Sequence, residues 1–161
     1  MIKTTTVLLA SIAAITFTAC NSGSGTAKSS EKMEQSEPMA DNNITFKTAE
    51  NYFVKNTVTE TIPSKITTQE DFDKYFGMAT TMGDQGKPTP IDFSKEYVIV
   101  VDHASTNKKT ELMPVSLTKK DADITLTYSM THGEDNGFTM HPFLMIIVDK
   151  SNDGNVMLQS K

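Results

Sequence analysis

The stretch Tyr97-Val98-Ile99-Val100-Val101 decides the fold of this 161-residue chain. The run is apolar throughout and mostly β-branched, and it is too short for a buried helix, so it predicts a β-strand. A strand without polar alternation needs cover on both of its faces. We therefore expect a central strand with other elements packed on each side of its sheet.

Further strands are expected downstream. Residues 143–148 form a second wholly apolar run, which predicts another buried strand. Apolar and polar residues alternate at 113–117 and at 124–130, and Lys119-Lys120-Asp121 separates the two segments, as is typical of a β-hairpin. Asp153-Gly154 predicts a last hairpin turn, which would join the 143–148 strand to residues 156–158.

Upstream, residues 52–59 alternate like a half-buried strand, and residues 67–77 predict a helix. A threonine cap precedes an acid three residues later, and Gly77 is expected to supply a left-handed C-terminal position. Phe72, Tyr75 and Phe76 recur at helical spacing, so one aromatic face is expected to point to the core.

These elements predict an α+β fold dominated by β-structure: an antiparallel sheet of about five to six strands with one short helix packed on it. Residues 44–161 are expected to form this single domain. The connections at 78–94 and 131–140 contain glycines and lack a sustained period, so both are expected to be long loops and candidate binding segments.

The start of the chain has the features of an export signal. Lys3 precedes an apolar run at 7–19 that is too short for a membrane span of about 20 residues. The sequence Phe17-Thr18-Ala19-Cys20 resembles a bacterial lipobox, in which cleavage occurs before a cysteine that carries thioether-linked lipid. By this resemblance residues 1–19 are a lipoprotein signal peptide, and Cys20 is the lipid attachment site, acylated with chains such as palmitate. The alternative is a simple secretory signal that leaves Cys20 as a free thiol.

Residues 20–43 are rich in Ser, Gly, Lys and Glu and offer little to bury, so they predict a lipidated flexible tether. By resemblance to diderm sorting rules, Asn21 after Cys20 favours the outer membrane of the cell envelope. The formal net charge of -5 and the absence of arginine argue against a nucleic-acid partner.

The residue types suggest two kinds of chemistry. Met130, His132, Met140 and His141 flank one expected loop, and thioether with imidazole suits Cu(I), so periplasmic copper binding is the alternative function. Asp102 and His103, with Ser105 or Ser129, suggest a nucleophilic triad. Adjacent strand residues point to opposite faces, however, and no G-x-S-x-G motif is present, so we expect neither an enzyme nor a resident cofactor.

The order of elements also resembles a known family over residues 66–150. The strings that carry the resemblance are Phe72-Asp73-Lys74-Tyr75-Phe76, Ile91-Asp92-Phe93-Ser94-Lys95, Pro142-Phe143 and Ile147-Val148-Asp149-Lys150. They are similar to the C-terminal domain of the protease-complex subunit PrcB and related small bacterial lipoproteins. The resemblance implies a non-enzymatic envelope module that binds or scaffolds a protein partner, possibly protease-related. We expect Met82, Phe138, Met140 and His141 to contact that partner.

Overall fold

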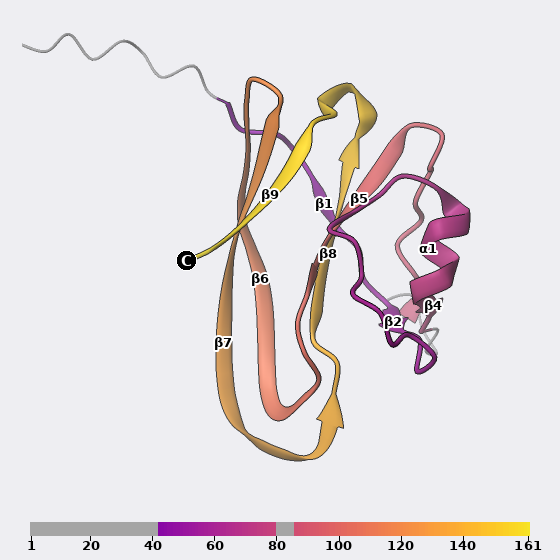
Figure 1. Cartoon of the computed structure of the whole chain (residues 1–161), viewed down its shortest axis with the longest axis vertical. Coiled ribbons are helices and arrows are strands. Elements are labelled where there is room, and N and C mark those ends of the chain that lie inside the picture. Colours follow the sequence, from indigo (N-terminus) through magenta and orange to yellow (C-terminus); the bar gives the residue numbers. More distant parts are fainter. Residues whose placement is uncertain (1–41, 80–85) are drawn as a thin grey trace, which may run out of the picture. The chain divides into compact units, whose positions relative to one another are not determined.

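The computed structural model describes residues 42–79 and 86–161, which belong to one compact unit. In chain order the elements are β1 (Lys47–Thr48), β2 (Tyr52–Val54), β3 (Lys65–Ile66), α1 (Gln69–Tyr75), β4 (Phe76–Met78), β5 (Glu96–Asp102), β6 (Thr106–Lys120), β7 (Asp123–Met140), β8 (Phe143–Asp149), the 3-10 helix η2 (Lys150–Asn152) and β9 (Asn155–Ser160). The predicted β-dominated α+β class is confirmed (Figure 1). The signal peptide, Cys20, the tether up to residue 41 and Met82 lie outside the described residues. The last two residues of the predicted tether contact β6: the carbonyl of Asn42 accepts the N–H of Lys119 at 2.8 Å, and Asn43 forms an isolated bridge with Thr118.

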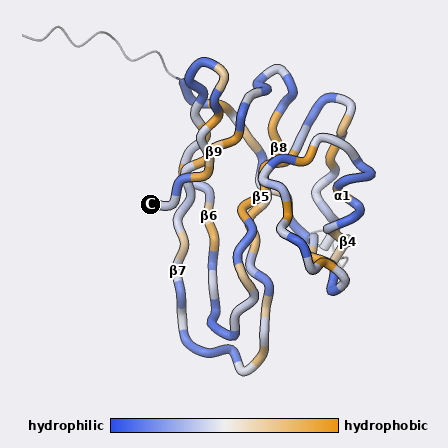
Figure 2. The backbone as a smooth tube through the Cα atoms, viewed as in Figure 1, coloured by the Kyte–Doolittle hydropathy of each residue, from blue (hydrophilic) through white to orange (hydrophobic). Residues whose placement is uncertain are grey.

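The central sheet has the strand order β1-β8-β5-β3, and all its neighbouring strands are antiparallel. β5 and β8 pair along their whole length, from Glu96 opposite Asp149 to Asp102 opposite Phe143. Every residue from Tyr97 to Val101 is at most 3% exposed, so the predicted central strand with two covered faces is confirmed. Figure 2 shows β5 and β8 as apolar segments in the interior.

A separate core lies on each face of this sheet. One face carries Tyr97, Ile99 and Val101, which pack against Leu117, Ile124 and Leu126 of the three-stranded sheet β6-β7-β9. The other face carries Val98, Val100, Met145 and Ile147, which pack against Phe72, Phe76 and their neighbours around α1 and the β2-β4 pair. Because side chains alternate along β5 and β8, apolar groups lie on both faces of the central sheet. The β6-β7-β9 sheet covers one face, and α1 with the β2-β4 pair covers the other.

The helix begins as the sequence predicts and ends differently. Thr68 is the N-cap, and its Oγ1 accepts a hydrogen bond from the backbone N–H of Asp71 at 3.1 Å. The expected left-handed position at Gly77 is wrong: Phe76 is already extended, with φ -114° and ψ 148°, and Gly77 lies in β4 opposite Phe53. A Cβ at Gly77 would stand 2.5 Å from Cζ of Phe53, so a larger residue here requires that ring, which is 46% exposed, to move.

The strand expected over 52–59 is shorter than predicted. β2 ends at Val54, which pairs with Phe76, and the chain then turns, with the N–H of Val58 donating to the carbonyl of Lys55 at 3.0 Å.

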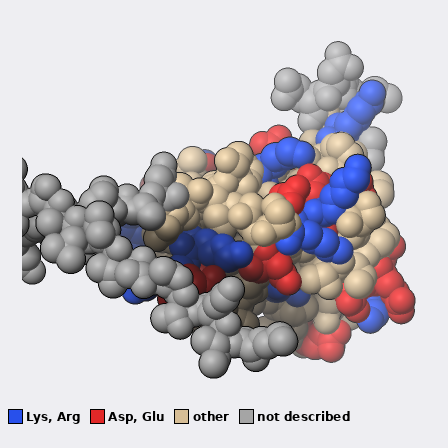
Figure 3. All heavy atoms as spheres, turned by 90° about the horizontal axis from the view of Figure 1, so that it is seen from above, with Lys and Arg blue, Asp and Glu red and all other residues tan. Residues whose placement is uncertain are grey.

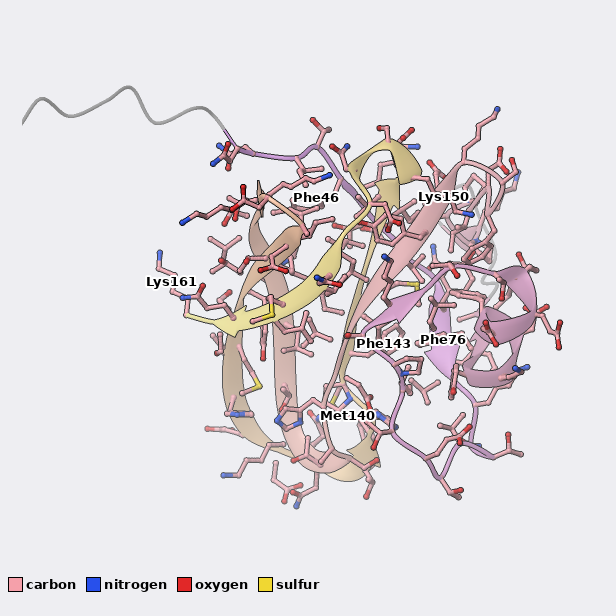
Figure 4. All side chains as sticks on the ribbon, turned by 45° about the horizontal axis from the view of Figure 1, so that its top comes forward. Phe46, Phe76, Met140, Phe143, Lys150 and Lys161 are labelled. Atoms are coloured by element: carbon pink, nitrogen blue, oxygen red, sulfur yellow. The ribbon has the colours of Figure 1, made fainter. Side chains whose placement is uncertain are left out.

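The aromatic side chains of this layer are in contact. The rings of Phe76 and Phe143, both labelled in Figure 4, have centroids 5.3 Å apart.

The hairpin of β6 and β7 is confirmed, with one change of face within β6. Leu112 and Leu117 both pack on the core, although an uninterrupted strand would place them on opposite faces. The pairing shifts register between Pro114 and Ser116, and this β-bulge leaves Met113 and Val115 56% and 46% exposed.

Two predictions about the chain after residue 130 are wrong. Residues 131–140 are not a loop, because β7 continues to Met140 and remains paired with β6 through an irregular register. β9 does not form a hairpin with β8. It crosses to the other sheet and pairs with β7 in parallel, from Asp123 opposite Asn155 to Tyr128 opposite Ser160. There Val156 packs on the core.

Candidate functional site

The three histidines of the chain come together where β5 ends and β7 turns into β8. His103 follows β5, His132 lies in β7 and His141 precedes β8. The backbone N–H of His103 donates to the carbonyl of Pro142 at 3.1 Å, which places the first and third histidines on neighbouring chain segments. We call this region the histidine end. Met140, labelled in Figure 4, lies at the same turn.

At the histidine end, Asp102 is paired with His141 and not with His103. The Oδ1 atom of Asp102 lies 2.6 Å from Nε2 of His141, and the two side chains are 22% and 31% exposed. Adjacent positions on an extended chain point away from each other, as the sequence indicates for Asp102 and His103. Within the described ranges, neither Ser105 nor Ser129 forms a hydrogen bond with an imidazole.

The rings of His103, which follows β5, and His132, in β7, are in contact. Their ring centroids are 5.8 Å apart, with a tilt of 59° between the planes. The Nδ1 atom of His103 lies 2.9 Å from the carbonyl of Ala104, and Nδ1 of His132 lies 3.0 Å from Oγ1 of Thr110. Each ring is therefore held through Nδ1.

The four residues expected to bind copper thus have different neighbours. The ring contact of His132 is with His103, whereas Nε2 of His141 is bound to Asp102. The sulfur of Met140 accepts a hydrogen bond from Asn136 at 3.2 Å. Sequence reasoning missed His103, Asp102 and Thr110 as members of these contacts. The contact of His103 depends on the packing of two sheets, and those of Asp102 and Thr110 depend on the register of the β5-β8 and β6-β7 ladders.

A pocket of about 250 Å³ opens beside His141. Its lining is mostly polar and consists of Val54, Lys55, Asn56, Val58, Ser105, Thr139, Met140 and His141. Next to these residues along β7, Phe138 is 63% exposed. Three of the four expected partner-contacting residues, Phe138, Met140 and His141, therefore lie at or beside one pocket.

The second expected binding segment, 78–94, contributes to a different pocket. This cavity of about 320 Å³ lies between α1, β2 and the described part of that segment, and it is lined by Tyr52, Gln69, Phe72, Met78, Pro88, Pro90, Ile91 and Phe93. The hydroxyl of Tyr52 donates to the carbonyl of Thr89 at 2.7 Å, and burial raises the pKa of Tyr52 above its ordinary 10.0. The described residues of the two segments thus line these two different pockets.

The charged side chains near the central sheet are arranged in pairs. Lys47 lies 3.1 Å from Glu96, and Lys65 is paired with Asp153. In Figure 3 the lysines and acids are interspersed on the face that is seen from above. This mixture on that face is unlike the continuous basic surface that binds a phosphate backbone.

Two further observations concern membrane spans and metal sites in residues 42–79 and 86–161. No helix among them is long and apolar enough to cross a membrane. The same residues contain no group of three or more His, Cys, Asp or Glu side chains placed to hold a metal ion.

No family model, no curated protein and no solved structure matches this chain. The resemblance to the PrcB C-terminal domain over residues 66–150 therefore stays a prediction.

Proposed function

We propose that this protein is a lipid-anchored, non-enzymatic module of the bacterial cell envelope that binds a protein partner through the end of β7 that contains Phe138. The lipid on Cys20 would attach it to the outer membrane. A tether of about 22 residues would allow the folded unit to range about 25 Å from the anchor. The resemblance to PrcB makes an envelope protease complex the first class of partner to test.

The observation that carries the proposal is the exposure of Phe138. Its side chain is 63% exposed on a strand that is paired with β6 on one side. Aromatic side chains on rigid elements supply much of the binding energy at protein interfaces. Phe138 is thus suited to be a central contact residue.

The surroundings of Phe138 favour a protein partner over a small molecule. The adjacent pocket combines Lys55, Asn56 and Thr139 with the thioether of Met140. Small-molecule sites are mostly enclosed and apolar, whereas protein interfaces combine an apolar centre with a polar rim.

The proposal is tested by photo-crosslinking in cells that express the full chain. A photoreactive phenylalanine analogue at position 138 is expected to give one discrete adduct, because the substitution keeps the ring. The same analogue at Met157, which is 55% exposed on β9, is the matched control and is expected to give none. Equal labelling from both positions, or no adduct from 138, would reject this surface.

Anchoring is tested separately in the same cells. Cys20→Ser is expected to move the chain from the membrane fraction to the soluble fraction, and mass spectrometry of the native N-terminus is expected to show acyl groups on Cys20. A soluble wild-type chain without acyl groups would reject the anchor and leave the crosslinking result intact.

A further inference from the structure

We propose that the Nε2 atoms of His103 and His132 form a two-imidazole binding site for Cu(I). This site differs from the methionine and histidine cluster expected from the sequence, since it includes His103 and leaves His141 bound to Asp102. It does not rest on the proposed partner binding.

The distance between the two rings fits a shared metal ion. A ligating nitrogen lies about 2.0 Å from the metal and about 1.2 Å from its own ring centre, so each ring centre lies about 3.2 Å from the ion. Two such rings are about 5.2 Å apart at a tetrahedral angle and about 6.4 Å apart when the ligands are in line. The observed separation of 5.8 Å falls between these limits.

The hydrogen bonds of both rings leave the same nitrogen available. A carbonyl oxygen only accepts, so Nδ1 of His103 donates to Ala104 and the lone pair of the neutral ring is on Nε2. The hydroxyl of Thr110 lies 3.2 Å from the carbonyl of Lys108, and when it donates its hydrogen there it accepts from Nδ1 of His132. Metal-binding histidines are commonly fixed in this way, by donation from the nitrogen that does not bind the metal.

The residues nearby favour Cu(I) over Zn²⁺. Zinc needs three or four His, Cys or carboxylate ligands, and within the described residues no such group of three exists. Cu(I) accepts fewer ligands and is bound well by imidazole and thioether. Met130 lies two residues before His132 on β7, hence on the same face of the strand, and its thioether is the candidate third ligand.

A bound ion would join two layers of the fold. His103 follows the central strand β5, and His132 belongs to the β6-β7-β9 sheet. Thr110, which orients His132, is 6% exposed and lies opposite it in the register of β6 and β7. His132 is therefore held on a pair of strands, which fix ligand positions better than loops do, and His103 directly follows the end of the paired strand β5.

The test is a titration of the full-length chain in detergent with Cu(I) under anaerobic conditions and with Ag(I) as a redox-stable analogue. Without lipid, Cys20 has a free thiol, which is itself a soft ligand for the ion. Binding at the two rings is therefore read from the imidazole ¹⁵N signals of each histidine. The expected result is that the Nε2 signals of His103 and His132 shift together and saturate at one ion per chain. The signals of His141 are expected not to follow them.

Variants show whether the two rings bind the same ion. His103→Gln is expected to weaken binding at His132 at least tenfold, while the matched variant His141→Gln leaves it unchanged. Thr110→Val is expected to weaken it roughly 10- to 100-fold, as for other residues that orient a metal ligand, and Thr110→Ser to restore it. If His132 binds the ion equally well without His103, or if His141 shifts with it, the two-imidazole site is wrong.

Discussion

The Nε2 atom of His141 lies 2.6 Å from Oδ1 of Asp102, and this contact joins the end of β5 to the residue pair that precedes β8. Asp102 pairs with Phe143 at the last position of the β5-β8 ladder, so the side-chain contact closes that end of the central sheet. Both side chains are partly shielded from water. The contact is therefore expected to contribute more than a fully exposed pair does.

The coupling between these two residues is measurable in a double-mutant cycle. Asp102→Asn, His141→Gln and the double variant are expected to give a coupling free energy of about 1 kcal/mol at neutral pH. Urea unfolding of the four proteins provides the measurement. A coupling energy that equals zero within error would show that the contact does not stabilise the fold.

Stability is expected to fall at alkaline pH because of Tyr97. Burial, with a smaller contribution from the charge of Asp153, raises the pKa of Tyr97 from 10.0 to about 12. The folded pKa is above the unfolded one, so the stabilisation is complete below pH 10 and is lost as the pH rises from 10 to 12. The loss is about 3 kcal/mol.

Unfolding free energies measured across that pH range check this expectation. Tyr97→Phe lacks the hydroxyl that donates to the carbonyl of Asn152 at 3.0 Å, so it starts from lower stability but loses most of the alkaline slope. A slope that is unchanged in this variant would assign the effect to other groups.

Truncation of two phenylalanines is expected to have very different effects on stability. Phe72 is 3% exposed in the core around α1, so Phe72→Ala is expected to cost about 3–5 kcal/mol. Phe138 is exposed, so Phe138→Ala is expected to change stability by less than about 0.5 kcal/mol. Thermal or urea unfolding compares them, and a large loss for Phe138→Ala would mean that this ring is structural.

The helix cap gives a fourth prediction. Thr68→Ala is expected to cost about 1 kcal/mol, and Thr68→Ser is the control that keeps the hydroxyl. The hydrogen bond from Lys74, followed by that from Thr68, holds the pKa of Asp71 below its ordinary 3.8. NMR titration of Asp71 is therefore expected to show a higher pKa in Thr68→Ala than in the wild type. Since the folded pKa of Asp71 is lowered, its stabilisation is present at neutral pH and is lost as the pH falls through that value.

Gly154 is expected to be required for the pairing of β9 with β7. A Cβ at Gly154 would lie 2.6 Å from the backbone oxygen of Ala122, which already accepts the N–H of Asn155 at 2.7 Å. Gly154→Ala is expected to cost about 1–3 kcal/mol and to expose the amides of β9 to hydrogen exchange. Gly133→Ala is the matched control, since its nearest contact would be an ordinary 3.4 Å. Equal effects of the two substitutions would contradict this steric reason.

Local patterns in the sequence predicted those features that depend on neighbouring residues. The cap at Thr68 follows from local hydrogen bonding, and the hairpin of β6 and β7 follows from alternation around a short turn. The left-handed position at Gly77 was predicted wrongly because the chain passes from α1 directly into β4 to pair with β2. That pairing partner is far away in the sequence, and a local pattern carries no information about it.

The candidate site divides in the same way. Phe138, Met140 and His141 were predicted from residue type and are adjacent in sequence, and the structure places them at or beside one pocket. The partner of His132 was not predictable, because His103 is brought to it by the packing of one sheet on another. Asp102 and Thr110 were missed because strand register brings them to their histidines, Asp102 at the end of the β5-β8 ladder and Thr110 opposite His132 in the β6-β7 ladder.

By itself, the sequence determined that a wholly apolar strand at Tyr97–Val101 must be buried on both faces within a β-dominated α+β fold, since burial of apolar side chains is set by composition and period. Only the tertiary structure decided that β9 joins β7 in parallel and that His103 meets His132. The physical reason is that strand partners and contacts between layers depend on which apolar faces cover each other, and this becomes fixed only when the whole core is packed.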